Sequence, residues 1–201
     1  MPPAADHHAL RVLMAPELPA GIVEHIDRVV TVASELAQRH RIDSIGESRA
    51  LLAAQGHDLL RAMPPEALLE AAETRGLEVS AIEREQPVLL HGPLGAVELE
   101  RRGWVTDAEA LHAIYWHTTG HPDFGPLAWA VFVADKIEPE KMMHWPALQA
   151  VAEAAEASLE EAARLYLTLN REKAAHEGWR LHPMAEATRK ALEGRTLATR
   201  G

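Results

Sequence analysis

Apolar residues recur every three or four positions over most of the chain, which is the spacing of one face of an α-helix. The clearest stripe predicts a helix at about 20–40 and consists of Ile22, Ile26, Val29, Val30, Ala33, Leu36 and Ala37. Similar patterns and their boundary residues predict further helices at about 47–61, 65–75, 94–102, 106–117, 126–137, 145–156, 158–177 and 183–194. Alternating β-branched runs, which predict strands, are missing. The predicted fold class is all-α.

Residues typical of helix ends support several of these boundaries. Thr106 stands three positions before Glu109, which is the spacing of a capping box at a helix start. Ser158 has the same relation to Glu161. The two prolines at 64–65 end the helix predicted before them, because proline cannot continue a helix.

One predicted helix is apolar on every side. The segment 127–137 contains a strand-like triplet, Val131-Phe132-Val133, within a longer apolar run. A run of this length is more economically explained as a buried helix than as a strand. We therefore expect this helix in the core.

The length of 201 residues is typical of one domain. The first 18 residues combine several prolines with a short apolar patch and show no sustained period. We expect residues 1–18 to form a tail or an ordered lead-in. Residues 19–201 are then expected to form a single helical bundle of about eight or nine helices.

Charge and hydropathy narrow the choice of partners. The chain has 20 Lys and Arg against 30 Asp and Glu, for a net charge of −10, and has no basic stripe. This argues against a nucleic-acid partner. No apolar run approaches the roughly 18 residues that cross a bilayer, and the N-terminus lacks the pattern of a secretion signal. We expect a cytoplasmic protein without a membrane partner.

The chain contains no cysteine but 12 histidines. The lack of cysteine excludes disulfides, thiolate zinc sites, iron–sulfur clusters and thiol nucleophiles. Any metal must therefore bind nitrogen and oxygen ligands. The candidates in chain order are His25, His57, Asp58, His91, His117 and Asp135.

Asp135 and the adjacent pair His57 and Asp58 also fit roles that need no metal. Asp135 lies in the apolar helix, where an acid is costly unless it is paired or bound to a cation. A buried salt bridge with Lys136 or with an arginine is the alternative. His57 and Asp58 are adjacent at the end of a predicted helix, where neighbouring side chains point about 100° apart. They can share an ion only at the helix shoulder, and a solvated surface pair is the alternative.

The ordered set of histidines and acids resembles the HD-domain metal-dependent phosphohydrolases. Three flanking motifs are similar to the YqeK-like branch: His91-Gly92-x-x-Gly95-Ala96, His117-Thr118-Thr119-Gly120 and Ala134-Asp135-x-Ile137-Glu138-Pro139. The resemblance extends over roughly residues 20–190. It implies an HD-type helical domain that hydrolyses a small nucleotide, diadenosine tetraphosphate, symmetrically to two ADP.

The same resemblance implies a centre with two divalent cations. One cation would be held by His25, His57, Asp58 and Asp135, and Asp58 would bridge to a second cation held by His91 and His117. His57 and Asp58 are expected to be catalytic. Iron is the expected metal, with manganese, zinc, nickel and magnesium as alternatives. Two such cations lower the pKa of a bridging water and neutralise charge on phosphate oxygens.

Residues near the motifs are expected to contact substrate: Arg61, Thr118, Thr119, Lys136, Glu138 and Lys141. The family commonly has Lys at the position of Arg61 and Arg at that of Lys141, and His121 stands where a basic residue is usual. These departures support the alternative of a nucleotidase or phosphatase acting on a nucleoside mono-, di- or triphosphate. A catalytically inactive nucleotide sensor is a second alternative.

The five tryptophans are expected in the core or at an interface. Trp116 stands beside His117, so lining a base pocket is its alternative role. The tryptophan-rich stretch at 104–129 leaves pairing into a homodimer open.

Overall fold

The chain is folded into helices joined by short connections. The computed structural model describes residue 4 and residues 6–198, with side chains as far as residue 195. This part of the chain contains twelve α-helices, two 3₁₀ helices and no strand. The all-α class is confirmed, whereas the expected count of eight or nine helices is wrong.

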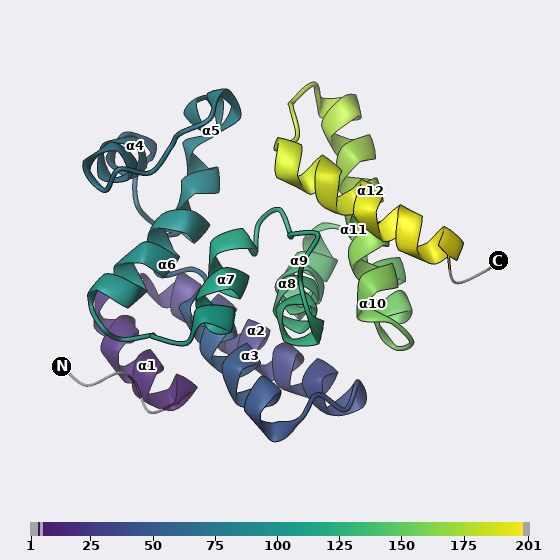
Figure 1. Cartoon of the computed structure of the whole chain (residues 1–201), viewed down its shortest axis with the longest axis horizontal. Coiled ribbons are helices and arrows are strands. Elements are labelled where there is room, and N and C mark those ends of the chain that lie inside the picture. Colours follow the sequence, from purple (N-terminus) through teal and green to yellow (C-terminus); the bar gives the residue numbers. More distant parts are fainter. Residues whose placement is uncertain (1–3, 5, 199–201) are drawn as a thin grey trace.

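The helices in chain order are α1 (His7–Met14), α2 (Ala20–Arg39), α3 (Ser44–Gly56), α4 (Pro65–Thr74), α5 (Ala81–Glu85), α6 (His91–Arg101), α7 (Ala108–Trp116), α8 (Pro126–Ile137), α9 (Pro139–His144), α10 (Leu148–Ala155), α11 (Leu159–Glu177) and α12 (Pro183–Ala198) (Figure 1). The 3₁₀ helices are Ala15–Glu17 and Pro87–Leu90.

Three helices, α1, α5 and α9, account for the difference in number. Helix α1 lies in the predicted tail, of which residues 1–3 and 5 are outside the described residues. Its Leu10 and Met14 are fully buried, and the helix packs against α3. Helices α5 and α9 have five and six residues, so neither is long enough to establish an apolar period.

Several predicted boundaries also change. Helix α3 ends at Gly56 rather than near Arg61, so His57 and Asp58 lie in the turn that follows. Helix α6 begins at His91, about three residues earlier than expected. Ser158 caps α11 as predicted, by accepting a hydrogen bond from the backbone N–H of the third residue. At α7, the cap is Asp107 rather than Thr106.

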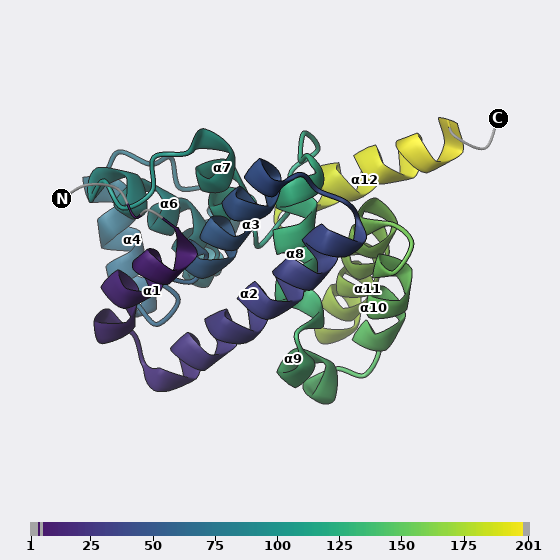
Figure 2. The same cartoon turned by 90° about the horizontal axis from the view of Figure 1, so that it is seen from below.

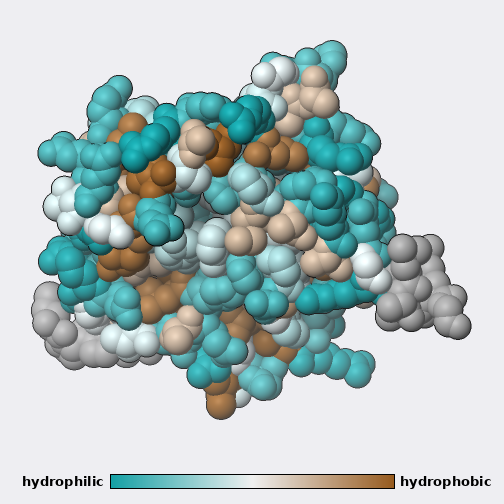
Figure 3. Space-filling view, turned by 45° about the horizontal axis from the view of Figure 1, so that its top comes forward, coloured by the Kyte–Doolittle hydropathy of each residue, from teal (hydrophilic) through white to brown (hydrophobic). Residues whose placement is uncertain are grey.

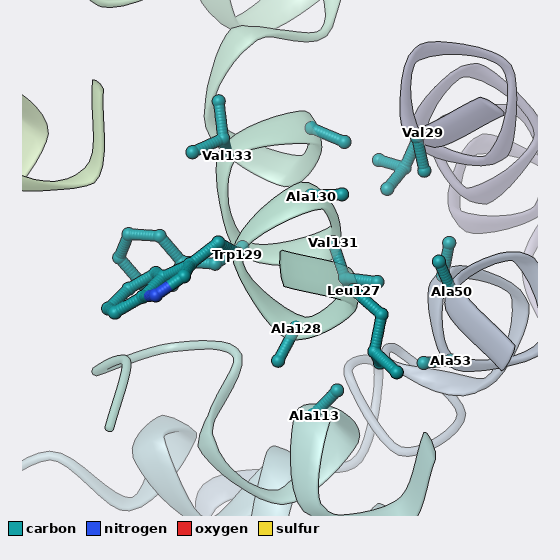
Figure 4. Packing of buried hydrophobic residues seen from close by; sticks show 14 of the residues in the cluster. Val29, Ala50, Ala53, Ala113, Leu127, Ala128, Trp129, Ala130, Val131 and Val133 are labelled. Atoms are coloured by element: carbon teal, nitrogen blue, oxygen red, sulfur yellow. The ribbon is translucent and has the colours of Figure 1, made fainter. Parts of the chain in front are cut away.

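Helix α8 is the centre of the molecule. All its residues from Leu127 to Ile137 are buried, which confirms the helix expected in this apolar run. It packs against α2, α3, α7, α10 and α11, and Figure 2 shows it between the N-terminal and C-terminal helices. In Figure 4, Val131 lies toward Ala50 and Ala53 of α3, where small side chains allow close approach. The polar residues at the end of α8 are thereby held inside the fold.

The surface is largely polar. Figure 3 shows one face, on which hydrophilic residues predominate and hydrophobic ones appear between them. Among the helices that the structure describes, none has both the length and the hydropathy of a membrane span.

Candidate metal centre

Six side chains from five segments meet where α2, α3, α6, α7 and α8 come together. They are His25 on α2, His57 and Asp58 directly after α3, His91 at the start of α6, His117 directly after α7 and Asp135 on α8. All are buried except His25, whose side chain is 12% exposed. The structure therefore brings together all six residues of the expected ligand set. A solvated surface pair of His57 and Asp58 is excluded by their burial.

Asp58 is at the middle of this cluster. Its Oδ1 lies 3.0 Å from Nε2 of His91 and 3.7 Å from Nε2 of His117. Its Oδ2 lies 3.6 Å from Nε2 of both His25 and His57. Burial raises the pKa of Asp58, but the adjacent His57 and His91 outweigh it and hold the pKa below its usual range. Each oxygen of this anionic carboxylate thus faces one pair of imidazoles.

Asp135 faces two of the same imidazoles and two lysines. Its Oδ1 lies 3.2 Å from Nε2 of His25 and 3.6 Å from Nε2 of His57. Lys136 donates to its Oδ2 at 2.5 Å, and Lys141 donates to its Oδ1. Burial raises the pKa of Asp135, but the two ammonium groups outweigh it and lower the pKa well below the usual value. The salt bridge between Asp135 and Lys136 that the sequence suggested is therefore present. The same carboxylate also lies against His25 and His57 of the cluster.

All four imidazoles present the same nitrogen to the centre. Nδ1 of His57, His91 and His117 each bonds the carbonyl oxygen three residues earlier in the chain. Nδ1 of His25 lies 3.4 Å from Oε1 of Glu138. Because carbonyl and carboxylate oxygens only accept, Nδ1 carries the hydrogen, and in the neutral ring Nε2 then keeps its lone pair. Three backbone carbonyls and the Glu138 carboxylate thus favour the tautomer that suits metal binding.

These donors fit divalent cations. Nε2 of His57 is fully buried and has no hydrogen-bond partner among the described residues. Nε2 of His91 lies 2.9 Å from Nε2 of His117, so two lone pairs face each other. Burial lowers the pKa of His117 well below its usual value, which keeps the ring neutral. Facing lone pairs and anionic carboxylates are satisfied together by a shared cation.

Gly92 provides space for His117. A Cβ at position 92 would lie 3.1 Å from Cε1 and Nδ1 of His117 and 3.0 Å from the carbonyl oxygen of Tyr115. We expect Gly92→Ala to tilt the imidazole and to lower manganese affinity by about 10–100-fold, as when a partner that orients a ligand is lost. Calorimetric titration of metal-stripped protein measures this affinity. Gly21→Ala is the control because nothing lies near its Cβ. Equal affinity in both variants would contradict the argument.

Two cavities adjoin the cluster. The His25 cavity has a volume of about 510 Å³, and its lining includes His25, Arg28, Glu138, Lys141, Trp145 and Lys173. The His91 cavity has a volume of about 240 Å³, and its lining includes His91, Arg61, Thr118, Thr119, Trp179 and Arg180. Lys136, Tyr166 and Asn170 line both. All six residues expected near substrate therefore line at least one cavity.

Two residues that the sequence singled out, His121 and Trp116, lie outside both cavities. His121 packs in an aromatic group with His112, Trp116 and Phe124 and lines neither cavity. Trp116 borders a separate surface groove with Val97, so it does not line either cavity at the metal centre. The unusual residue at position 121 therefore does not alter the lining of either cavity.

Sequence reasoning missed several cavity residues. The sequence predicts Trp145 and Trp179 in the core or at an interface, yet both are only half-buried and each lines one cavity. Tyr166, Asn170 and Lys173 lie on one face of α11. No motif or ligand spacing marks these residues, because they lie outside the segments that carry the metal cluster.

The fold and the cluster define an all-helical protein with a buried group of imidazoles and carboxylates that could hold metal ions. A sequence model of the HD domain matches residues 22–140, which is more than half of the chain. The chain therefore belongs to the HD domain family, a family of hydrolases. Membership implies that it binds a divalent metal.

Individual relatives extend this assignment. The chain is 33% identical over 138 residues to the symmetrical bis(5'-nucleosyl)-tetraphosphatase of Bacillus subtilis, covering 69% of this chain and 71% of that one. It is 30% identical over 134 residues to the enzyme of that name from Halalkalibacterium halodurans, covering 64% and 67%. These matches confirm the resemblance to the YqeK-like branch.

A solved structure gives an independent comparison of the fold. The crystal structure of a predicted HD superfamily hydrolase involved in NAD metabolism from Clostridium acetobutylicum aligns with a TM-score of 0.85. The two chains are 24% identical, and the alignment covers 94% of this chain and 97% of the other. At this identity the likeness concerns the fold alone.

Proposed function

We propose that the protein hydrolyses diadenosine tetraphosphate symmetrically to two ADP, using divalent cations. The observation that carries this proposal is Asp58 among four imidazoles that all direct Nε2 inward, in a chain related to symmetrical tetraphosphatases. His25, His57, Asp58 and Asp135 would hold the first cation, and Asp58, His91 and His117 would hold the second. Iron is the first candidate metal, followed by manganese.

Bound cations would supply a water of lowered pKa and positive charge for the phosphate oxygens under attack. The chain contributes binding and orientation. Glu138 holds His25 and accepts a 2.7 Å hydrogen bond from Nε of Arg28, so the imidazole has little freedom to turn. Lys136 and Lys141 bring positive charge to the edge of the cluster, where an anionic polyphosphate would bind.

The experiment is hydrolysis of diadenosine tetraphosphate by protein loaded with iron(II) or manganese, with products separated by chromatography. We expect ADP as the sole product and no turnover after chelation, with recovery when metal is returned. AMP and ATP in equal amounts would overturn symmetric cleavage. Faster turnover of dAMP, GDP or GTP would instead favour a mononucleotide substrate, which the exposed Arg61 in the His91 cavity would also suit.

A further inference from the structure

Each of the two cavities reaches the metal cluster through one imidazole. His25 lines the larger cavity and His91 lines the smaller one. These two imidazoles face different oxygens of Asp58, at 3.6 Å from Oδ2 and 3.0 Å from Oδ1 respectively. The cavities share a wall that includes Lys136 and Tyr166. A chain of phosphates lying along this wall would therefore pass beside the cluster.

Lys136 is placed to guide such a chain. Its side chain is 9% exposed, and its Nζ lies 5.2 Å and 5.4 Å from the ring centroids of Phe132 and Tyr166. These two rings and the carboxylate of Asp135 hold the ammonium group at the junction of the cavities.

Each cavity also has one half-buried indole and cationic side chains. In the His25 cavity, Nζ of Lys173 lies 4.7 Å from the ring centroid of Trp145. In the His91 cavity, the indole N–H of Trp179 donates to Glu177 at 3.0 Å, which anchors the ring. Indoles stack on nucleobases, and nearby cations attract phosphates. The same two kinds of recognition group therefore occur on both sides of the cluster.

We propose that the two cavities bind the two nucleoside ends of one dinucleoside polyphosphate, with Trp145 and Trp179 as the base-binding residues. This inference rests on the proposed function and adds to it a reason for symmetric cleavage. With a nucleoside held on each side, the middle of the phosphate chain lies at the cluster. Hydrolysis of the central bond then leaves one ADP in each cavity.

The two sites are not equivalent. The His25 cavity falls within the range of about 300–1,000 Å³ that is usual for small-molecule sites, whereas the His91 cavity lies below it. The His91 cavity also contains the exposed Arg61, which has no ion-pair partner among the described residues. Two ADP molecules are therefore expected to bind with different affinities.

Calorimetric titration of the manganese-loaded full chain with ADP tests this arrangement. We expect two ADP per wild-type chain. In Trp145→Ala and in Trp179→Ala, one of the two sites should weaken about tenfold or more, the effect of losing one stacking ring. Trp116→Ala is the matched control and retains two sites, because Trp116 lines neither cavity. The conservative variants Trp145→Phe and Trp179→Phe restore the affinity of the weakened site by restoring a stacking ring, which separates loss of binding from loss of folding. One ADP per wild-type chain would overturn the proposal.

Kinetics separates this inference from the proposed function. Each alanine variant should raise the KM for diadenosine tetraphosphate about tenfold or more, the effect of losing one stacking ring. Adenosine tetraphosphate has a single nucleoside, so only one of the two variants should raise its KM. Turnover to ADP by a wild type with one ADP site would reject the two-cavity arrangement and keep the function. Two ADP sites without turnover would reject the function alone.

Discussion

Replacing Asp58 by asparagine is expected to reduce kcat/KM for diadenosine tetraphosphate by about 10³-fold or more. Loss of a group that merely orients a metal ligand costs about 10–100-fold, and Asp58 itself lies among four imidazoles at 3.0–3.7 Å. The amide has nearly the same shape but lacks the negative charge that both sides of the cluster share. The loss should therefore appear in metal content as well as in turnover.

The measurement pairs initial rates of ADP release with metal analysis of the same preparations. Asp123→Asn is the matched control, since this carboxylate is 86% exposed in the loop after α7 and lines neither cavity. We expect the control to keep wild-type rate and metal content. An Asp58→Asn protein that retained full metal and full rate would show that this carboxylate has no role in the centre.

The six residues of the cluster were predictable because their order and flanking motifs are readable in the sequence. The positions of these residues relative to the helix ends were less predictable. A Cβ at Gly56 would lie 2.9 Å from Cδ1 of Leu99 and 3.0 Å from Cδ1 of Ile114. The end of α3 is thus packed against α6 and α7, and such tertiary contacts are not visible in a local pattern. The prolines at 64–65 indicated a stop well beyond the observed end of α3 at Gly56.

The residues that line the cavities were not predictable either, because tertiary packing decides which residues border a cavity. Trp145 lies between α9 and α10, and Trp179 lies between α11 and α12. The packing of α9, α10 and α11 against α8 brings these connections near the cluster. Apolar periodicity indicates which face of a helix is buried, but it does not indicate which half-buried residues border a cavity. The sequence also indicated an ion pair of Asp135 with Lys136 but not the second one with Lys141.

Replacing Glu98 by alanine is expected to lower the free energy of unfolding by about 3 kcal/mol, the low end of the cost of breaking a buried ion pair. The carboxylate of Glu98 is 6% exposed and accepts hydrogen bonds from Arg75, Arg101 and Arg102 at 2.5–2.9 Å. The value is at the low end because the arginines are 23–61% exposed and regain water when the carboxylate is removed. Urea unfolding at pH 7 measures the difference, with the exposed Glu100→Ala as control.

The same substitution should have a defined pH dependence. The hydrogen bond from Arg101, with the other two guanidinium groups, lowers the pKa of Glu98 from 4.5 to about 2. A carboxyl group whose pKa is depressed on folding stabilises the fold above its unfolded pKa and loses that contribution as the pH falls toward the folded pKa. The difference between wild type and Glu98→Ala should therefore be constant above pH 4.5 and shrink between pH 4.5 and 2. A difference that stays constant through this interval would mean that packing, rather than the three charges, makes Glu98 stabilising.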